Sequence, residues 1–261
     1  MRDYNIYAYV VLHYGNDYLS YSLKSIYDSV DRLYIFYTPH PSHGHMTDVS
    51  PVETRAELMS TIRDDLGRDE MTLGKVHWHE TDIWNEGQQR DYAVRFLFNS
   101  GADLILVCDY DEIWHPHVLD KALNHVWQTN GARNWLVNFR HAWRSFNFMC
   151  DDNNWPVRII DTRHADGIGY VPKELGDIYH MGYAVTDSVM HYKWECHGHK
   201  DELRPNWFEE KWQAWPPVDD CHPTNGKNDD GVGWWNPQPF DKRELPYVLH
   251  NHPFFNLERI E

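Results

Sequence analysis

Three acidic side chains follow an apolar run, and their types and spacing suit the binding of a cation. The apolar segment 104–108 leads directly into Asp109, Tyr110, Asp111 and Glu112. A short apolar run of this kind predicts a strand that is buried on both faces. Ligands of open α/β sheets bind just beyond the carboxyl ends of such strands. In an extended chain Asp109 and Asp111 lie on the same side and repel each other, so the pattern predicts a hard divalent cation between them.

The segments before this acidic turn alternate between strands and helices. β-rich segments predict strands at 4–13, 33–37, 73–79 and 103–109. Apolar residues at helical spacing predict helices at 16–29, 51–66 and 86–100. Asn16 or Asp17 is expected to cap the first helix, and Pro51 is expected in the first turn of the second. The alternation predicts an α/β protein with a mostly parallel central sheet and helices on both faces.

The second half of the chain has a different pattern. After a helix expected at 116–128, β-rich segments at 134–149 and 157–161 predict a smaller antiparallel part. A Trp-rich helix is expected at 200–215. The segment 216–239 lacks periodicity and predicts a long functional or mobile loop. No repeat or low-complexity linker divides the sequence, so we expect a single domain, 1–261, with halves at 1–115 and 116–261.

Composition and charge argue against several classes of protein. The 261 residues carry a formal net charge of −16, which argues against nucleic-acid binding through a broad basic surface. The four cysteines are widely spaced, which predicts reduced thiols rather than a disulfide framework. No stretch has the length and apolarity of a transmembrane helix, and the first residues lack the apolar core of a secretory signal. We therefore expect a soluble, cytoplasmic protein.

Four segments together resemble glycosyltransferases of the GT-A fold, of the broad family-2-like group. Segment 10–15 with its following helix is similar to the family's first strand and nucleotide-facing loop, and 85–91 is similar to the helix start before its metal motif. Segment 106–112 resembles the Asp-x-Asp motif with a trailing Glu. Segment 180–184 resembles a His-x-Gly-Tyr sequence of several members. With the elements between them, these segments span about residues 4 to 195.

The resemblance implies a metal-dependent, hexosyltransferase-type enzyme. It would move a sugar from a nucleoside-diphosphate sugar, with UDP favoured, to a hydroxyl acceptor, with carbohydrate favoured over nucleic acid. Mn²⁺ or Mg²⁺ would bridge the two phosphates and neutralise charge as the glycosidic bond breaks. Residues 1–115 would form the donor-binding half and 116–261 the acceptor-binding half. The implied donor-binding residues are Leu12, His13, Tyr14, Gly87, Arg90, Cys108, Asp109 and Tyr110.

Within that group the resemblance implies individual roles. Asp109 would face the ribose or the metal, Asp111 would bind the metal directly, and His180 or His191 would complete the metal site. Arg90 would pair with a phosphate or with Asp109. Tyr110 points away from the two carboxylates in an extended chain and is expected to pack.

The acceptor half offers further candidates. Glu174, Asp187 and Glu195 are the candidates for a base that deprotonates the acceptor hydroxyl, and both inverting and retaining outcomes stay open. Trp234 and Trp235 are the expected acceptor platform, because their loop offers little hydrophobic core for them to pack into. Cysteine and histidine, the usual ligands of zinc, also occur together at Cys196, His197, His199, Cys221 and His222. Their spacing matches no standard zinc finger.

Three alternatives compete with this interpretation. A haloacid-dehalogenase-type phosphohydrolase also places Asp-x-Asp after an apolar strand, but it favours Thr or Val where Ile113 stands and usually uses the first strand. A transferase acting on a hydroxymethylated base in viral DNA would need a local basic groove, for which the candidates are Lys193, Lys200, Arg204 and Lys211. A non-catalytic carbohydrate-binding protein would keep the fold without turnover, although the joint presence of Asp109, Asp111 and Arg90 argues against it.

Overall fold

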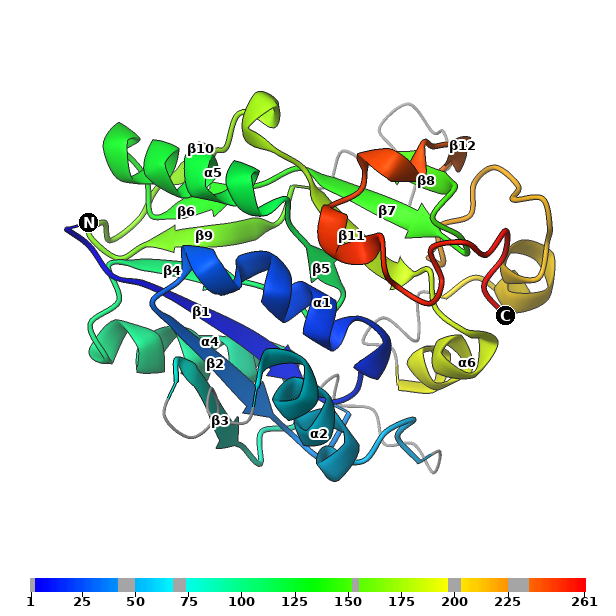
Figure 1. The fold of residues 1–261 in the computed structure, drawn as a ribbon, viewed down its shortest axis with the longest axis horizontal. Helices are drawn as coiled ribbons and strands as arrows, with labels where there is room; N and C mark the ends of the chain where they lie inside the picture. Colours follow the sequence, from blue (N-terminus) through cyan, green and yellow to red (C-terminus); the bar gives the residue numbers. More distant parts are fainter. Residues whose placement is uncertain (1–2, 42–49, 68–73, 152–154, 197–202, 225–234) are drawn as a thin grey trace.

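The computed structural model describes residues 3–41, 50–67, 74–151, 155–196, 203–224 and 235–261 (Figure 1). Within these ranges, seven strands form one sheet in the order β10-β6-β9-β4-β1-β2-β3. Five strands form a second sheet in the order β12-β8-β7-β11-β5. The two sheets meet where the chain passes from β4 to β5, which is the acidic turn.

The larger sheet is mostly parallel, as predicted. β1 (Ile6–Leu12) pairs in parallel with β2 (Arg32–Tyr37) and β4 (Leu104–Val107), and β2 pairs in parallel with β3 (Val76–Glu80). β9 (Val157–Asp161) runs antiparallel to β4 and to β6 (Asn134–Leu136), and β10 (Ile168–Tyr170) is parallel to β6. The carboxyl ends of β1 to β4 therefore lie at one edge of the sheet.

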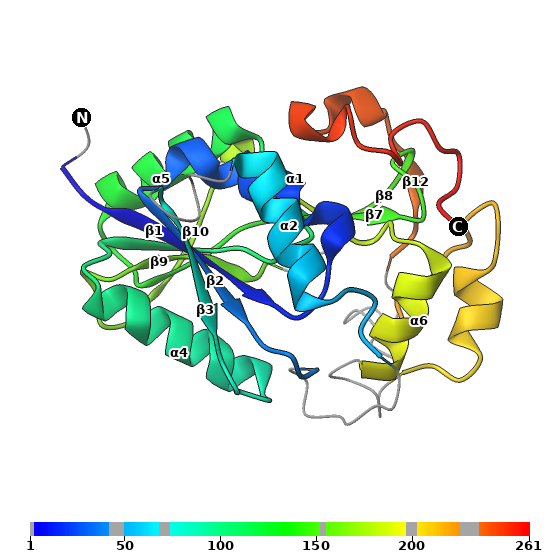
Figure 2. The ribbon, with the colours of Figure 1, turned by 60° about the horizontal axis from the view of Figure 1, so that its bottom comes forward.

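Helices cover both faces of this sheet, as predicted (Figure 2). Ile6, Ala8 and Val10 of β1 pack in one hydrophobic cluster with apolar residues of α1 (Asn16–Ile26), α2 (Arg55–Leu66) and α5 (Pro116–Thr129). Tyr7 and Tyr9 point the other way and pack with the buried residues of α4 (Glu86–Asn99). The alternation of side chains along each strand thus supplies two cores from one sequence.

Two helix starts differ from the sequence prediction. Gly15 is the N-cap of α1, and neither Asn16 nor Asp17 caps the helix. Instead, the Glu53 carboxylate accepts the backbone N–H groups of Gly15 and Asn16, at 3.2 Å each. Helix α2 begins at Arg55 rather than at position 51, because Thr54 and Glu57 form a capping box.

The second sheet divides the segment expected as strand at 134–149. β6 belongs to the larger sheet, whereas β7 (Phe139–Trp143) and β8 (Phe148–Asp151) form an antiparallel pair in the smaller one. β11 (Ile178–Tyr183) lies between β7, in parallel, and β5 (Glu112–Ile113), antiparallel. β12 (Gln238–Pro239) pairs with β8. The smaller sheet is thus partly antiparallel, as predicted.

The remaining C-terminal elements pack against this smaller sheet, except for η2, which packs against α5. They are α6 (Asp187–Cys196), the π-helical turn η4 (Phe208–Trp212), and the 3-10 turns η2 (Lys173–Leu175), η5 (Lys242–Glu244) and η6 (Tyr247–Leu249). The helix expected at 200–215 is therefore confined to η4 in the part that the structure describes. Arg144, fully buried, donates to the Asp187 carboxylate at 2.6 Å and to the Ile260 carbonyl at 2.9 Å, which ties α6 to the C-terminal segment.

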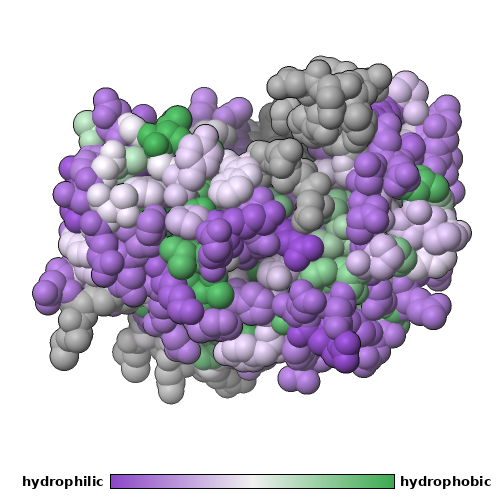
Figure 3. Space-filling view, turned by 90° about the horizontal axis from the view of Figure 1, so that it is seen from above, coloured by the Kyte–Doolittle hydropathy of each residue, from purple (hydrophilic) through white to green (hydrophobic). Residues whose placement is uncertain are grey.

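The surface agrees with the acidic, polar composition. Seen from above, it is mainly hydrophilic, with small and separate hydrophobic groups (Figure 3). In the described ranges, none of the helices combines the length and the apolarity that a membrane crossing requires.

Candidate functional site

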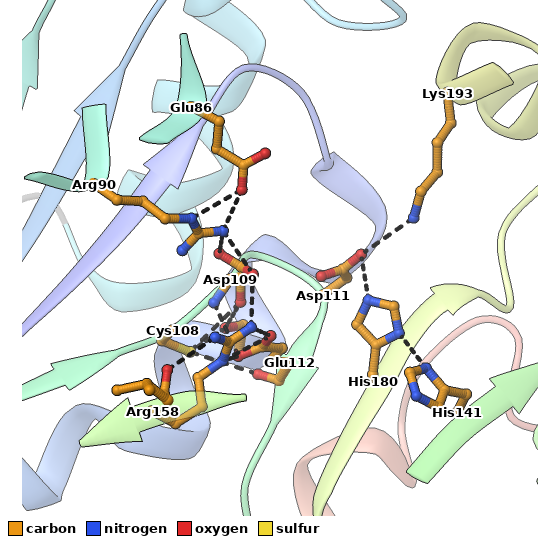
Figure 4. A network of polar contacts seen from close by, with 12 residues as sticks. Glu86, Arg90, Cys108, Asp109, Asp111, Glu112, His141, Arg158, His180 and Lys193 are labelled. Carbon is orange, nitrogen blue, oxygen red and sulfur yellow. Dashed lines mark hydrogen bonds and ion pairs between the residues drawn. The ribbon is translucent and has the colours of Figure 1, made fainter. Parts of the chain in front are cut away.

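The acidic turn is folded back on itself rather than extended. The backbone N–H of Glu112 donates to the carbonyl of Asp109 at 3.1 Å. Figure 4 shows the Asp109 and Asp111 side chains pointing toward different groups of partners. The prediction that both carboxylates share one side is therefore wrong, because side chains alternate only along an extended chain.

Asp109 is held by two arginines. Arg90 Nη2 donates to Asp109 Oδ1 at 2.7 Å, and Arg158 Nη2 donates to Oδ2 at 3.1 Å. Glu86 also accepts from Arg90, at 2.6 Å. Burial would raise the pKa of Asp109, but the two guanidinium groups outweigh it and leave the pKa below its ordinary value. Arg90 therefore pairs with Asp109, which was one of the two partners expected for it; the other was a phosphate.

Glu112 and Arg158 complete this charge cluster beneath the turn. The fully buried Glu112 accepts from Arg158 Nε at 2.8 Å. Burial raises the pKa of Glu112 to about 8, with Arg158 acting in the opposite direction. Arg158 was not singled out from the sequence. Its signal was an arginine between the apolar residues Val157 and Ile159 of β9, where a charge needs a buried partner.

Asp111 points into a second group of side chains, on β11 and α6. His180 Nε2 lies 3.5 Å from Asp111 Oδ2, and Lys193 Nζ lies 3.9 Å from the same oxygen. Asp111 is only 4% exposed, and burial raises its pKa to about 6 although Lys193 acts in the opposite direction. A buried carboxylate with a raised pKa gains from a further cation beside it. The structure thus brings together Asp111 and His180, both predicted, with Lys193.

His180 is buried in a form that favours the neutral imidazole, and His141 holds its ring in place. Its Nδ1 lies 2.9 Å from Nδ1 of His141, its neighbour across the parallel β7–β11 pair. Burial lowers the pKa of His180 well below the ordinary histidine value, and the nearby His141, Lys193 and Arg158 lower it further. A neutral imidazole has one nitrogen lone pair free for a metal. His141 was not singled out from the sequence, because only the strand register brings it to His180.

The second predicted histidine lies elsewhere. His191 is exposed on α6, and its ring stacks on Phe208 at 4.1 Å between centroids. Two positions later, on the other side of the helix, Lys193 reaches Asp111. His191 and Glu195 instead line a cavity of about 390 Å³ between α6 and η4. The prediction that His191 joins the metal site is therefore not supported by its position.

The predicted donor loop packs tightly against α6 and the acidic turn. His13 Nδ1 lies 3.0 Å from the Thr38 carbonyl, and His13 Nε2 lies 2.5 Å from the Tyr192 hydroxyl. The Tyr14 ring contacts those of Tyr110 and Tyr192. Tyr110 is therefore packed, as expected. Leu12 and Cys108 are buried in the sheet, and Gly87 lies in the first turn of α4.

The three candidate bases lie in three different environments. The Asp187 carboxylate accepts from Arg144 and, at 2.9 Å, from Trp212 Nε1, so it serves the packing of α6. Glu174 is exposed on η2, which packs against α5. Glu195 lines the α6–η4 cavity. None of these contacts assigns a base, and the role stays a prediction for each.

The expected acceptor platform consists of Trp234 and Trp235, and only Trp235 belongs to the described residues. Trp234 lies outside the described residues. Trp235 is 5% exposed, and its ring stacks on His141 at 4.4 Å, so it supports the site from behind instead of offering an open ring. Of the zinc-like group, Cys196 and Cys221 are buried, whereas His197 and His199 lie outside the described residues.

Asp111 and His180 fit a divalent cation that keeps positions for other ligands. They provide one carboxylate and one neutral imidazole, with facing atoms 3.5 Å apart. Among the residues described here, no group of three or more His, Cys, Asp or Glu side chains is arranged to hold a metal. Mg²⁺ is usually bound through one or two carboxylates together with substrate phosphates and water. The donor set therefore suits an ion that is shared with a phosphorylated ligand.

Gly182 allows these side chains to meet, and we expect Gly182→Ala to disrupt the site. A Cβ at position 182 would lie 2.5 Å from Asp111 Oδ2, 2.7 Å from Lys193 Nζ and 2.8 Å from His180 Cε1. Overpacking of this kind costs about 1–3 kcal/mol of stability. Urea unfolding measures that loss, and Gly131→Ala is the matched control, because its Cβ would meet only a carbonyl at 3.9 Å. Equal stability of the two variants would contradict the expected clash.

The raised pKa of Asp111 predicts a specific pH dependence of stability in the metal-free protein. The folded state holds this proton up to about pH 6, whereas the ordinary value is 3.8. The resulting stabilisation is fully present below the unfolded pKa and is lost as the pH rises through the folded pKa. Urea unfolding should show wild type losing up to about 3 kcal/mol relative to Asp111→Asn across this window. Parallel pH profiles of the two proteins would contradict the assignment.

Comparisons with known proteins give only distant structural similarity. No protein-family model and no curated protein matches the chain. Residues 1–349 of S. aureus TarS match with a TM-score of 0.42 and 12% identity, over 68% of this chain and 60% of that one. Glucosyl-3-phosphoglycerate synthase from Mycobacterium tuberculosis, in a complex with Mn²⁺, UDP and phosphoglyceric acid, matches with a TM-score of 0.32 and 16% identity, over 53% of this chain and 44% of that one.

A shorter protein gives a similar result. The 4-diphosphocytidyl-2C-methyl-D-erythritol synthase of Anaerococcus prevotii matches with a TM-score of 0.39 and 10% identity, over 72% of this chain and 96% of that one. TM-scores and identities this low do not establish a shared activity. The chain spans less than two thirds of TarS 1–349 and less than half of the mycobacterial synthase. The functional argument therefore rests on the residues of this chain.

Proposed function

We propose that this protein is a metal-dependent glycosyltransferase that moves a sugar from a nucleoside-diphosphate sugar to a hydroxyl acceptor. The observation that carries the proposal is the meeting of Asp111 and His180, 3.5 Å apart and beside Lys193, at the carboxyl edge of the parallel strands. That edge is where open α/β sheets bind their ligands. UDP is the favoured nucleotide and a carbohydrate the favoured acceptor, as the resemblance to GT-A enzymes implies.

The site residues would divide the work of holding a diphosphate. Asp111 and His180 would hold Mn²⁺ or Mg²⁺. The bound ion would neutralise the charge that develops on the leaving diphosphate. Lys193 reaches the same oxygen of Asp111 from α6, so its ammonium group is positioned for a phosphate oxygen next to the ion. The Asp109–Arg90–Arg158 cluster would keep the turn, and hence Asp111, in place.

A stacked pair of rings suits the nucleobase at the far end of the same edge. His40 follows β2 and stacks on Trp84, which follows β3, at 3.8 Å between centroids and 13° between planes. Asp82 fixes His40 through a contact of 3.0 Å. In the sheet order β4-β1-β2-β3 these rings lie two to three strands from the acidic turn, about 10–14 Å away at the usual strand spacing. A nucleoside diphosphate lying across the strand ends would join the two places.

The geometry disfavours a phosphohydrolase of the haloacid dehalogenase type. Its first Asp would have to attack phosphorus, which requires a free carboxylate oxygen. Here the equivalent residue is Asp109, and both of its oxygens accept hydrogen bonds from arginines. Among the described residues, Asp111 has only longer contacts with charged or titratable groups, to His180 at 3.5 Å and to Lys193 at 3.9 Å. This arrangement suits a metal-bridged phosphate.

A thermal-shift screen of nucleotide sugars with and without Mn²⁺ tests the proposal. A donor that binds the folded state at one hundred times its Kd should stabilise the protein by about 2.7 kcal/mol. We expect stabilisation by UDP-sugars that depends on Mn²⁺ and is lost in Asp111→Ala. Turnover of phosphate esters, with no response to any nucleotide, would refute the proposal in favour of a hydrolase. A glycan bound equally well after chelation would favour a non-catalytic binding protein.

A further inference from the structure

Behind the Asp111–His180 pair lies a second layer made of His141 and Trp235. His141 Nδ1 is 2.9 Å from His180 Nδ1, a normal hydrogen-bond length. His141 is only 4% exposed, and its ring stacks on the buried Trp235 at 29° between planes. The parallel register pairs His141 directly with His180. The position of His141 is therefore fixed by the strand on one side and by an aromatic ring on the other.

The hydrogen bond between the two histidines has two possible directions. Either His180 Nδ1–H donates to His141, or His141 Nδ1–H donates to His180. In the first case the lone pair of His180 is at Nε2, which faces Asp111; in the second, Nε2 carries the proton. Only the first case lets Nε2 bind a cation beside Asp111.

The distances at the other end of the His180 ring favour the first case. Nε2 is 3.5 Å from Asp111 Oδ2, longer than the 2.7–3.2 Å typical of N–H···O hydrogen bonds. If Nε2 carried a proton, this carboxylate would be a strong acceptor within reach of a small movement. The strong, short contact of His180 is instead the one through Nδ1.

We infer that His141 is a positioning residue whose Nδ1 accepts a hydrogen bond from His180 Nδ1–H and so holds the Nε2 lone pair toward Asp111. The inference rests on the proposed function for its purpose, the binding of a divalent ion with a diphosphate. It assigns to Trp235 the role of fixing the His141 ring, in place of the acceptor platform expected from the sequence. Partners of this kind behind a metal-binding histidine set its tautomer and orientation.

Two substitutions separate the acceptor at Nδ1 from the packing of the ring. His141→Asn places an amide oxygen near the position of Nδ1 but removes the ring that stacks on Trp235. His141→Phe keeps the ring and removes the acceptor. We expect His141→Phe to weaken Mn²⁺ binding in the presence of UDP by roughly 10- to 100-fold, and His141→Asn to recover most of that loss.

Titration of free Mn²⁺ by electron paramagnetic resonance measures this affinity without requiring turnover. Thermal unfolding of each variant shows whether the fold is retained. An unchanged Mn²⁺ affinity in folded His141→Phe would overturn the inference and leave the proposed function intact. A loss in His141→Asn as large as in His141→Phe would also overturn it, because an acceptor at this position would then not restore the affinity.

The tautomer of His180 can be read directly from long-range ¹H–¹⁵N spectra of the metal-free protein at neutral pH. We expect a protonated Nδ1 and a bare Nε2 in wild type, and a change toward protonated Nε2 in His141→Phe. A protonated Nε2 in wild type would overturn the inference. This readout also separates the two proposals, because failure of the wild type to bind Mn²⁺ with UDP would refute the function while the spectra still decide the role of His141.

Discussion

Asp111→Asn is expected to lower sugar transfer by roughly 10³-fold while it makes the metal-free protein more stable. A metal ion at a developing charge contributes several kcal/mol to the transition state, and each 1.36 kcal/mol is a factor of ten in rate. The asparagine removes the anion that would hold this ion. It also removes a buried charge whose pKa is raised to about 6 by burial. At neutral pH the variant should gain roughly 1–3 kcal/mol of unfolding free energy.

The opposite signs of the two effects make this prediction specific. Donor turnover with Mn²⁺ gives the first effect, and urea unfolding of chelator-treated protein gives the second. Asp91→Asn is the matched control, because Asp91 is exposed on α4. A variant that loses both activity and stability would indicate that Asp111 serves the fold rather than a ligand.

Arg158→Met is expected to destabilise the protein by about 3–5 kcal/mol, the usual cost of removing one partner from a buried ion pair. Arg158 is 11% exposed in its side chain and pairs with both Glu112 and Asp109. Without it, the fully buried Glu112 loses the guanidinium group that donates hydrogen bonds to it and lowers its pKa. Urea unfolding at neutral pH measures the change.

A second substitution tests the reason for this loss. Glu112→Gln removes the buried carboxyl group that loses its guanidinium partner, so Arg158→Met combined with Glu112→Gln should recover a large part of the lost stability. Neighbouring residues in one charge network are expected to be non-additive by 0.5–3 kcal/mol. Simple addition of the two single effects would show that Arg158 acts through packing against Phe139, over whose ring it lies at 4.9 Å, and not through charge.

Local signals in the sequence were sufficient for the first half of the fold. Strands at 4–13, 33–37 and 103–109 were predicted with small boundary errors, because a parallel sheet buried on both faces needs continuous apolar runs. The helix starts were less certain. Asn16 and Asp17 are good caps by type, yet Glu53, distant in sequence, takes the backbone N–H groups that they would have served.

The smaller sheet was predicted only in outline. The segment 134–149 contributes strands to both sheets, and β11 inserts between β5 and β7. Which strands pair is decided by contacts between residues far apart in sequence, and no local periodicity encodes them. For the same reason Arg158 and His141 were missed although each lies in a segment that was recognised as β-rich.

The sequence by itself determined that Asp109 and Asp111 follow a buried strand at the carboxyl edge of an α/β sheet, the edge where such sheets usually bind ligands. It also offered His180 as a partner, within a segment whose Gly182 leaves room for the side chains of Asp111, His180 and Lys193. Only the tertiary structure decided how the two acids divide their roles. The turn directs Asp109 to Arg90 and Arg158, and Asp111 to His180 and Lys193. The physical reason is that charge pairing in a buried site depends on distance in space, which spacing along the chain does not fix.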